Sequence, residues 1–292
     1  MYSYKEKYGE YLSRIEARLK KFYEELDCKP DVLDESLKYS LKSGGKRIRP
    51  VLMYAAADLL GFDDEALDDY ALALELIHTY SLIHDDLPEM DNDDFRRGKP
   101  ANHKVFGAGN AVLAGDGLLN TAYYILLSHC NYGKHCVDAA KFMCDCAGVK
   151  GMIAGQAADI YCAANAVKDG DMLDFIVKNK TGRLLSAAVA TPAILSGGRY
   201  FVELRQFGED LGMLFQLTDD VLDERGREDT LGKTTGKDRE ENKLTYVTFY
   251  GVEQCLVYAD VLSSKCLGLL EGVGGDTRFL RDIVSFVRYR ES

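Results

Sequence analysis

The sequence is poor in proline, histidine and tryptophan. It has five prolines, five histidines and no tryptophan in 292 residues, and no proline follows Pro192. Proline breaks helices, so the C-terminal third of the chain can form long helices without interruption. The N-terminal segment is charged throughout, and no run of about eighteen apolar residues occurs, which argues against a secretion signal and a membrane anchor. We therefore expect a cytoplasmic, largely helical protein.

Positive charge is also in short supply. The chain has 36 Lys and Arg residues against 47 Asp and Glu residues, which gives a net charge of −11. This balance argues against a general binder of nucleic acid or of anionic membranes. The content of 47% hydrophobic and 28% charged residues is typical of a globular protein. The eight cysteines are scattered and form no CxxC pair, so we expect reduced thiols.

The hydrophobic pattern predicts an all-α fold. Apolar residues recur at three- and four-residue steps over 68–84, 184–195 and 207–222, without the alternation of a half-buried strand. These segments are apolar on more than one side, which is typical of central helices in a bundle. Short loops or helix ends are expected at the glycine-rich segments 42–46, 196–199 and 271–276. No linker divides the chain, so we expect a single domain over residues 1–292 with roughly ten or more helices.

Three motif-like segments do not match their templates. GREDTLGKT at 226–234 has five residues between its glycines, where a phosphate-binding loop has four. DNDD at 91–94 is followed by residues that supply neither the next ligand nor the required glycine of a calcium loop. The HisCys pairs at 129–130 and 135–136 match no familiar zinc spacing. None of these segments therefore predicts a phosphate-binding loop, a calcium loop or a zinc site.

The first of two acidic clusters lies in SLIHDDLPEMDNDDFRRGKP at 81–100. It begins where the apolar pattern of the preceding helix ends, and it contains Asp85, Asp86 and Asp91. A solvated surface face would not normally place its charges at the end of such an apolar stretch. The position of the cluster makes it a candidate site, although a solvated helix end also explains this cluster taken alone.

The second acidic cluster lies in FQLTDDVLDERG at 215–226. Asp219 and Asp223 are four residues apart, so they project from one face of a helix, and Asp220 lies beside them. This cluster also extends an apolar helical stretch.

Closely packed carboxylates repel each other by roughly 3 kcal/mol per pair at a separation of about 5 Å, so a cation must compensate them. Oxygen ligands without cysteine or histidine suit magnesium, which binds through one or two carboxylates while a substrate phosphate fills other positions. Either cluster alone fits a solvated helix end. The presence of both favours a site for a magnesium-bound diphosphate.

Basic residues lie beside glycines and next to the aspartates. GlyGlyLysArgIleArgPro at 44–50 places Lys46, Arg47 and Arg49 in a turn opened by glycines, and His78 lies two helical turns before the first aspartate cluster. Arginine suits bidentate phosphate contacts and lysine acts as a point charge. Further candidates for phosphate contacts are Arg96, Arg97, Lys180, Lys233 and Lys243.

In combination, these motifs resemble the trans-isoprenyl diphosphate synthases, in particular the bacterial farnesyl diphosphate synthase type, with plant-type geranylgeranyl diphosphate synthases as close relatives. The resemblance spans nearly the whole chain and implies an isoprenoid synthase fold, with helices around a central cavity, and a homodimer. It rests on GGKRIRP (44–50), SLIHDDLPEMDNDDFRRGKP (81–100), NHKVFG (102–107), LAGD (113–116), GQAADI (155–160), KTG (180–182), FQLTDDVLD (215–223) and LGK (231–233).

The resemblance also implies a role for each matching residue. The implied aspartate-rich motifs, which would hold three magnesium ions against an allylic diphosphate, are Asp85, Asp86 and Asp91, and Asp219, Asp220 and Asp223. The implied allylic-diphosphate contacts are Arg96, Lys180, Lys233 and Lys243. The implied isopentenyl-diphosphate contacts are Lys46, Arg49, His78 and Arg97. Oxygens of Thr181 and Gln216 would face the allylic cation.

The implied reaction is ionisation of the allylic diphosphate, attack by the double bond of isopentenyl diphosphate, and loss of a proton to the departing diphosphate. Tyr80 and Ser81 precede Asp85 by five and four residues and so lie deeper along the same helix. In the family, an aromatic side chain at the position of Tyr80 usually accompanies a fifteen-carbon product, so we expect farnesyl diphosphate. The segment 90–107 looks more like the plant-type enzymes, which keeps geranylgeranyl diphosphate as the alternative.

Two other classes of protein share the fold implied by the resemblance. A non-catalytic subunit of a prenyl synthase heterodimer would not need Asp219 and Asp223, which are present. A terpene cyclase would lack the GGKRIRP segment at 44–50, which is also present. Both classes therefore rank below a catalytic synthase.

Overall fold

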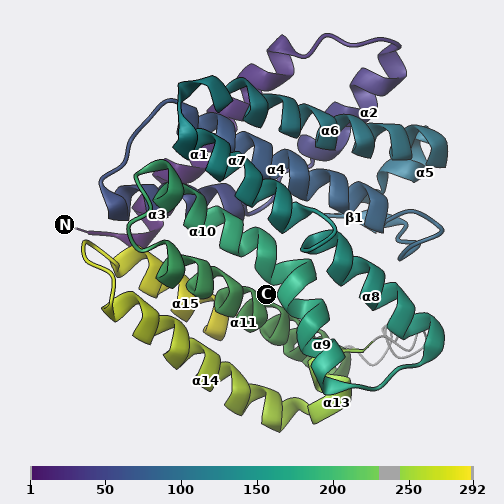
Figure 1. Ribbon diagram of the computed structural model, residues 1–292. Helices are drawn as coiled ribbons and strands as arrows, with labels where there is room; N and C mark the ends of the chain where they lie inside the picture. Colours follow the sequence, from purple (N-terminus) through teal and green to yellow (C-terminus); the bar gives the residue numbers. More distant parts are fainter. Residues whose placement is uncertain (1, 230–243, 291–292) are drawn as a thin grey trace. The chain divides into compact units, whose positions relative to one another are not determined.

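The computed structural model describes residues 2–229 and 244–290. Nearly all of the regular structure in these residues is helical, which confirms the expected all-α class (Figure 1). The chain divides into two compact units, Met1–Lys141 and Phe142–Ser292. The single domain over residues 1–292 stays a prediction.

The first unit is built around α4, a helix buried on almost every side. Of its twenty residues, twelve are buried, and it packs against α6, α3 and α1. The loop expected at 42–46 is confirmed, because α2 ends at Leu41 and α3 begins at Ile48. The elements in order are α1 (Tyr4–Glu25), α2 (Asp31–Leu41), α3 (Ile48–Leu60), α4 (Ala66–Asp85), β1 (Phe95–Arg96), β2 (Lys99–Pro100), α5 (Asn102–Phe106), α6 (Ala108–Ser128), the 3₁₀ turn η1 (Cys130–Tyr132) and α7 (Lys134–Ala147), which crosses the boundary.

A short hairpin departs from the all-α expectation. Strands β1 and β2 pair antiparallel, with Phe95 opposite Pro100. The two turn residues, Arg97 and Gly98, have φ angles of 55° and 75°. Positive φ at both positions fits a type I′ turn, which matches the twist of the two strands. The helical pattern ends before this segment, and no strand was predicted there.

The second unit contains the longest helix, α11, which packs against α10 and α14. The predicted helix 207–222 is confirmed within α11, but the helix extends beyond the second aspartate cluster to Asp229. The elements in order are α8 (Met152–Asn165), α9 (Gly170–Val177), the π-helical turn η2 (Lys178–Gly182), α10 (Arg183–Leu195), α11 (Phe201–Asp229), α13 (Tyr246–Tyr250), α14 (Val252–Glu271) and α15 (Arg278–Tyr289).

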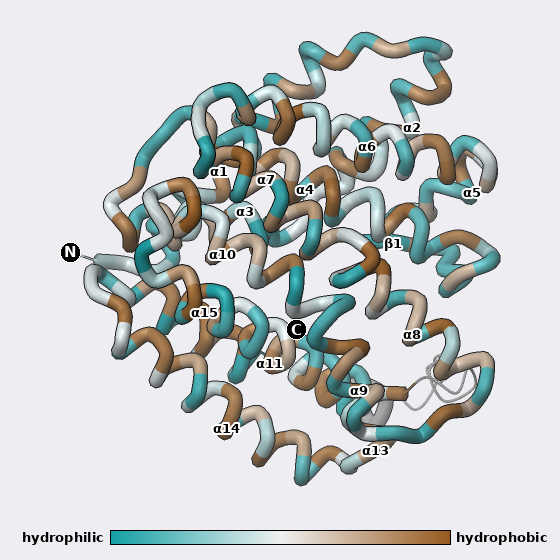
Figure 2. Tube along the Cα trace, in the orientation of Figure 1, coloured by the Kyte–Doolittle hydropathy of each residue, from teal (hydrophilic) through white to brown (hydrophobic). Residues whose placement is uncertain are grey.

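Helices of the second unit differ in how much of their surface is apolar. In α10, eleven of thirteen residues are buried, as its pattern predicted. In α15, Phe279, Leu280, Ile283, Val284 and Val287 are buried at steps of three and four residues, and the trace of this helix also includes hydrophilic residues (Figure 2). This spacing places the apolar side of α15 on α14 and α11. None of the described helices is both long and apolar enough to cross a membrane.

Candidate active site

The first aspartate cluster begins at the C-terminal end of α4, as predicted. Asp85 is the last helical residue, and its carbonyl oxygen accepts a hydrogen bond from the backbone N–H of Asp91 at 2.8 Å. This bond closes a compact loop after the helix and brings the two aspartates of the motif together. The apolar body of α4 thus sets the position of the cluster.

Asp86 differs from its neighbours because it is buried, with 2% of its surface exposed. Its Oδ1 accepts a hydrogen bond at 2.9 Å from Nε of Arg96 and a second one from the same guanidinium. Arg96 also lies 3.3 Å from a carboxylate oxygen of Asp93. Burial raises the pKa of Asp86, and the Arg96 guanidinium offsets this rise in part. Arg96, a predicted phosphate contact on β1, therefore neutralises the aspartate cluster here.

Three of the four predicted isopentenyl-diphosphate contacts come together in the first unit. Arg49 donates to Nε2 of His78 at 3.2 Å, because a guanidinium cannot accept a hydrogen bond. Arg97 donates to the carbonyl oxygen of Gly44 in the glycine loop. Burial, together with the charge of Arg97, lowers the pKa of Arg49 to about 10. Buried cations crowded in this way would be stabilised by an anion.

The fourth contact, Lys46, lies exposed in the same glycine loop. The hydroxyl of Tyr8, on α1, donates to the backbone carbonyl of Lys46. Both ends of the loop are therefore held: one by Arg97 at Gly44, the other by Tyr8 at Lys46.

The contacts of Arg47 contradict the prediction that all three cations of the glycine turn contact phosphate. Its side chain is buried and lies 2.7 Å from Glu75 and 2.9 Å from Glu16. It also donates to the carbonyl oxygen of Leu41 at 2.7 Å. A buried carboxylate such as that of Glu75 is costly unless a cation pairs with it. Arg47 therefore has a structural role.

We expect His78 to make the protein less stable in acid. Burial and the positive charges of Arg49 and Arg97 lower the pKa of His78 well below 6.5. As the pH falls below about 6.5, His78 takes up a proton in the unfolded state before it does so in the folded state. Its contribution to the free energy of unfolding is therefore complete above that pH. It is lost as the pH falls, by at most ~1.4 kcal/mol per pH unit. Urea unfolding at pH 7.5 and 5.5 should show that His78→Gln removes this part of the acid sensitivity. An identical difference between the two proteins at both pH values would contradict the prediction.

The two predicted chain-length residues behave differently. Tyr80 is buried, with 6% of its surface exposed, and its ring meets the ring of His84 edge-on at a centroid distance of 5.7 Å. Its hydroxyl has no hydrogen-bond partner among the described residues. The hydroxyl of Ser81 instead donates to the carbonyl oxygen of His78 at 2.9 Å. The large side chain at this depth along α4 is therefore Tyr80.

In the second aspartate cluster, Asp219 and Asp220 are half-buried and Asp223 is exposed. Asp220 accepts hydrogen bonds from the Gln216 side-chain amide and from the backbone N–H of Tyr246, both at 2.9 Å. Burial raises its pKa to about 7, although both hydrogen bonds oppose the rise. Asp219 and Asp223, four residues apart on α11, share a face as predicted. Its two hydrogen bonds and its raised pKa thus distinguish Asp220 from Asp219 and Asp223, the proposed metal ligands of this motif.

Lys180 and Thr181, predicted to contact the allylic substrate, lie in the π-helical turn η2. The Lys180 ammonium is 2.6 Å from Asp159, and the Thr181 hydroxyl donates to Oε1 of Gln216 at 3.3 Å. A pocket of about 140 Å³ opens between these side chains. Its polar lining comes from Asp159, Lys180, Thr181, Gln216, Asp220, Asp223 and Thr245, and its apolar lining from Ile176, Val177 and Leu244. The pocket therefore combines a cation, carboxylates and an apolar wall.

For two residues of this region, no role was predicted from the sequence. Asp159, the partner of Lys180, lies in the GQAADI segment and could have been found there. Arg290 pairs with Asp219, and its guanidinium stacks on the Phe215 ring at 4.0 Å. A single arginine near the end of the chain gives no signal in the sequence. The predicted phosphate contacts Lys233 and Lys243 lie outside the described residues.

The aspartate clusters fit magnesium by their chemistry. No three or more acidic, histidine or cysteine side chains in the described part of the chain lie close enough to hold a metal ion by themselves. Magnesium commonly uses one or two protein carboxylates and completes its shell with water and phosphate oxygens. Asp219 already attracts a cation, the Arg290 guanidinium. These carboxylates therefore suit ions that a substrate diphosphate helps to bind.

Known proteins with similar sequences and structures make prenyl diphosphates. A chloroplastic geranylgeranyl pyrophosphate synthase of Capsicum annuum is 43% identical over 90% of this chain and 73% of its own length. A farnesyl diphosphate synthase of Geobacillus stearothermophilus is 42% identical over 80% of this chain and 79% of its own. Among solved structures, a Legionella pneumophila geranyltransferase has a TM-score of 0.87 at 32% identity, covering 99% of this chain and 97% of its own.

A Helicobacter pylori geranyltransferase complexed with magnesium and isoprenyl diphosphate has a TM-score of 0.78 at 30% identity, covering 94% of this chain and 95% of its own. Together with the fold and the site, these likenesses define a short-chain trans-prenyltransferase. The model of the polyprenyl synthetase family matches residues 30–266, and the chain belongs to that family. The family depends on magnesium.

Proposed function

We propose that the protein is a farnesyl diphosphate synthase, which condenses isopentenyl diphosphate with dimethylallyl or geranyl diphosphate to give (2E,6E)-farnesyl diphosphate. The observation that carries the choice of product is the buried ring of Tyr80 on α4, five residues before Asp85. At 1.5 Å per residue, the ring lies roughly 7.5 Å below the aspartates along the helix axis. A side chain of this size would block the growth of a longer product.

The pocket of the second unit is proposed to take the allylic diphosphate. Lys180 would bind the diphosphate, and the oxygens of Thr181 and Gln216 would face the carbon that becomes cationic. The apolar side chains Ile176 and Val177 would keep water away from that cation. Charge stabilisation and exclusion of water are the two contributions that such an ionisation requires.

The proposed metal ligands are Asp85, Asp86, Asp91, Asp219 and Asp223, and by analogy three magnesium ions are expected with bound diphosphate. When bound, magnesium would neutralise the charge that develops on the leaving diphosphate. In the first unit, Lys46, Arg49, His78 and Arg97 would bind isopentenyl diphosphate. The neutral state of His78 suits a hydrogen-bonding contact with a phosphate rather than an ion pair.

A direct assay tests the proposal. The purified protein is incubated with isopentenyl and geranyl diphosphate and magnesium, and the products are dephosphorylated and separated by gas chromatography. Farnesol should be the main alcohol, and EDTA should abolish it. The absence of any prenyl alcohol longer than geraniol would refute prenyl transfer and favour a non-catalytic subunit, and a cyclic hydrocarbon would favour a terpene cyclase.

Geranylgeranyl diphosphate is the second candidate product, because the Capsicum relative makes it and is as similar as the Geobacillus enzyme. Geranylgeraniol as the main alcohol in the same assay would decide for it. We also propose a homodimer in the cytoplasm, which sedimentation and localisation of the tagged protein would test.

Tyr80→Ala is expected to lengthen the product. Removing the ring opens space beneath the aspartates, so the variant should convert farnesyl diphosphate onward and give mainly geranylgeraniol after dephosphorylation. Ser81→Ala is the matched control. The Ser81 hydroxyl is hydrogen-bonded to the backbone of α4, and its removal opens little space. An unchanged product in Tyr80→Ala would show that another side chain limits the chain length.

A further inference from the structure

We propose that Glu209 is a positioning residue of the allylic site, holding the π-helical turn η2 in the shape that directs Lys180 and Thr181 into the pocket. Glu209 does not line the pocket itself, and neither the family match nor the relatives assign it a role. The inference rests on the proposed function, because it names a further residue on which allylic binding depends.

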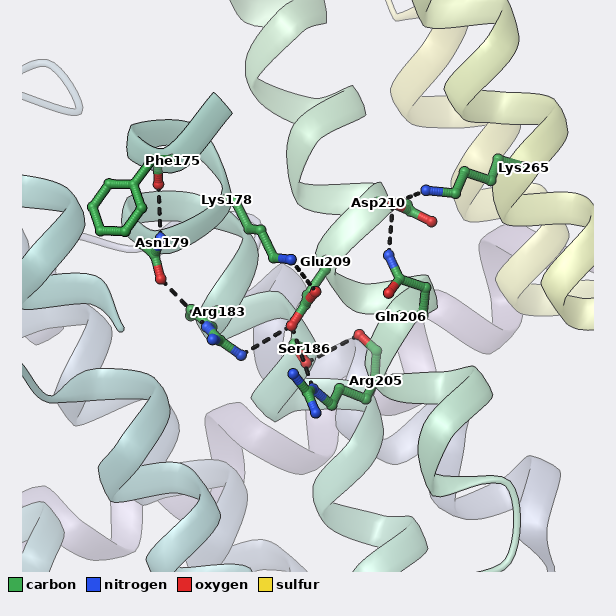
Figure 3. Close-up of polar contacts among 10 residues, drawn as sticks. All are labelled: Phe175, Lys178, Asn179, Arg183, Ser186, Arg205, Gln206, Glu209, Asp210 and Lys265. Carbon is green, nitrogen blue, oxygen red and sulfur yellow. Dashed lines mark hydrogen bonds and ion pairs between the residues drawn. The ribbon is translucent and has the colours of Figure 1, made fainter. Parts of the chain in front are cut away.

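Glu209 is a buried carboxylate, 2% exposed, on which three cations converge (Figure 3). Its Oε2 lies 3.1 Å from the Lys178 ammonium, and its Oε1 lies 2.9 Å from Arg183 and 3.4 Å from Arg205. Lys178 is the first residue of η2, and Arg183 follows its last residue. One carboxylate therefore binds both ends of the turn that carries Lys180 and Thr181.

Backbone contacts fix η2 from two further sides. A Cβ atom added to Gly155, on α8, would lie 2.2 Å from the backbone nitrogen of Lys180. A Cβ atom added to Gly212, on α11, would lie 2.4 Å from the Cα of Gly182. Glycine at both positions lets the two helices touch the backbone of η2 directly. The turn therefore has no room to shift as long as its ends are held.

The spacing along α11 links Glu209 to the pocket. Gly212, Gln216 and Asp220 follow it by three, seven and eleven residues, which places all four on one face of the helix. Along this face, Glu209 binds the ends of η2, Gly212 contacts its backbone, Gln216 binds Thr181, and Asp220 lines the pocket. On α8, Asp159 likewise follows Gly155 by one turn and pairs with Lys180.

A π-helical turn contains one more residue than the corresponding α-helical turn and persists only where its surroundings favour it. Without the charge of Glu209, Lys178 and Arg183 would repel each other, and the turn could relax to α-helix. One residue of slippage rotates the following side chains by about 100°. Such a rotation would take Lys180 away from Asp159 and out of the pocket.

Asp210, the next residue on α11, provides a matched control. It is as buried as Glu209, at 2% exposed, and also pairs with a lysine, but it faces the other way (Figure 3). Its partners are Lys265 of α14 and the amide of Gln206, both at 3.0 Å, and neither belongs to η2. Glu209→Gln and Asp210→Asn therefore each remove one buried negative charge, and only the first acts on the turn.

A second matched pair of variants changes only side chains that are partly exposed. Lys178 and Arg205 both bind Glu209, and their side chains are 43% and 44% exposed. Only Lys178 belongs to η2. Lys178→Met and Arg205→Met should both fold, since each leaves Glu209 with two cations.

The experiment measures the KM for geranyl diphosphate, kcat, and the calorimetric affinity for inorganic pyrophosphate with magnesium in the wild type and four variants. We expect Glu209→Gln to raise the KM and weaken pyrophosphate binding at least tenfold, and Lys178→Met at least threefold. Asp210→Asn and Arg205→Met should stay within twofold of the wild type, although Asp210→Asn should also lower the melting temperature.

Equal KM values and pyrophosphate affinities within each pair would overturn the positioning role and leave Glu209 a purely structural residue. If Glu209→Gln does not fold, the Lys178 and Arg205 pair decides alone. A wild type that makes no farnesyl diphosphate but binds pyrophosphate with magnesium would refute the proposed product, while the binding comparison would still test the role of Glu209.

Discussion

Asp219→Asn is expected to lower the rate of farnesyl diphosphate formation at least a thousandfold, roughly 4 kcal/mol of lost transition-state stabilisation. Asp219 is proposed to hold magnesium, and an amide oxygen carries no negative charge to attract it. The substitution also breaks the ion pair with Arg290 in the resting protein. The rate is measured at saturating magnesium and substrates, so that weaker binding alone does not account for the loss.

Asp260→Asn is the control for the effect of losing an arginine partner. Asp260 also pairs with an arginine near the end of the chain, Arg288, at 2.7 Å, and it lies outside the pocket. This variant should keep the wild-type rate within twofold. If Asp219→Asn retained more than a tenth of the activity, or if Asp260→Asn lost as much, the metal role of Asp219 would be wrong.

Gly212→Ala is expected to cause a large loss of stability for the addition of a single methyl group. The new Cβ would lie 2.4 Å from the Cα of Gly182, a backbone atom that cannot rotate away. Overpacking of this kind costs about 3 kcal/mol. At about 2 °C per kcal/mol for a chain of this size, the melting temperature should fall by roughly 6 °C.

Gly268→Ala provides the matched comparison. Gly268 lies within α14, and a Cβ atom there would meet nothing within 4 Å. Alanine should therefore stabilise the helix by about 0.5–1 kcal/mol. Thermal unfolding of both variants measures the difference, and similar melting temperatures would show that α11 and η2 can move apart at Gly212 without cost.

The local pattern predicted the helices well and the ion pairs poorly. The apolar repeat over 68–84 indicated a helix, and α4 covers it from Ala66 to Asp85. The same reasoning could not distinguish Arg47 from Arg49, which lie two residues apart in one glycine-opened turn. Packing decided between them, because the buried carboxylate of Glu75 lies within reach of Arg47. Arg49 contacts His78 instead.

In the second aspartate cluster, too, the sequence predicted the helical spacing but not the surroundings of each side chain. Four-residue spacing predicted that Asp219 and Asp223 share a face of α11. The high pKa of Asp220 could not be predicted, because it comes from burial in the folded chain, and the backbone donor at Tyr246 that opposes it lies 26 residues further along the chain. The backbone of η2 likewise lies against glycines of α8 and α11, and nothing within residues 178–182 predicts its π-helical shape.

The sequence by itself determined the helical class of this protein, the positions of both aspartate clusters and its family. These features depend on the spacing of residues within one helix or one loop, which short-range geometry controls. Only the tertiary structure decided which cation neutralises which carboxylate, which aspartate is buried, and how the turn carrying Lys180 and Thr181 is held. Such pairings join residues far apart in the chain, and their energies depend on burial, which arises only when the helices pack.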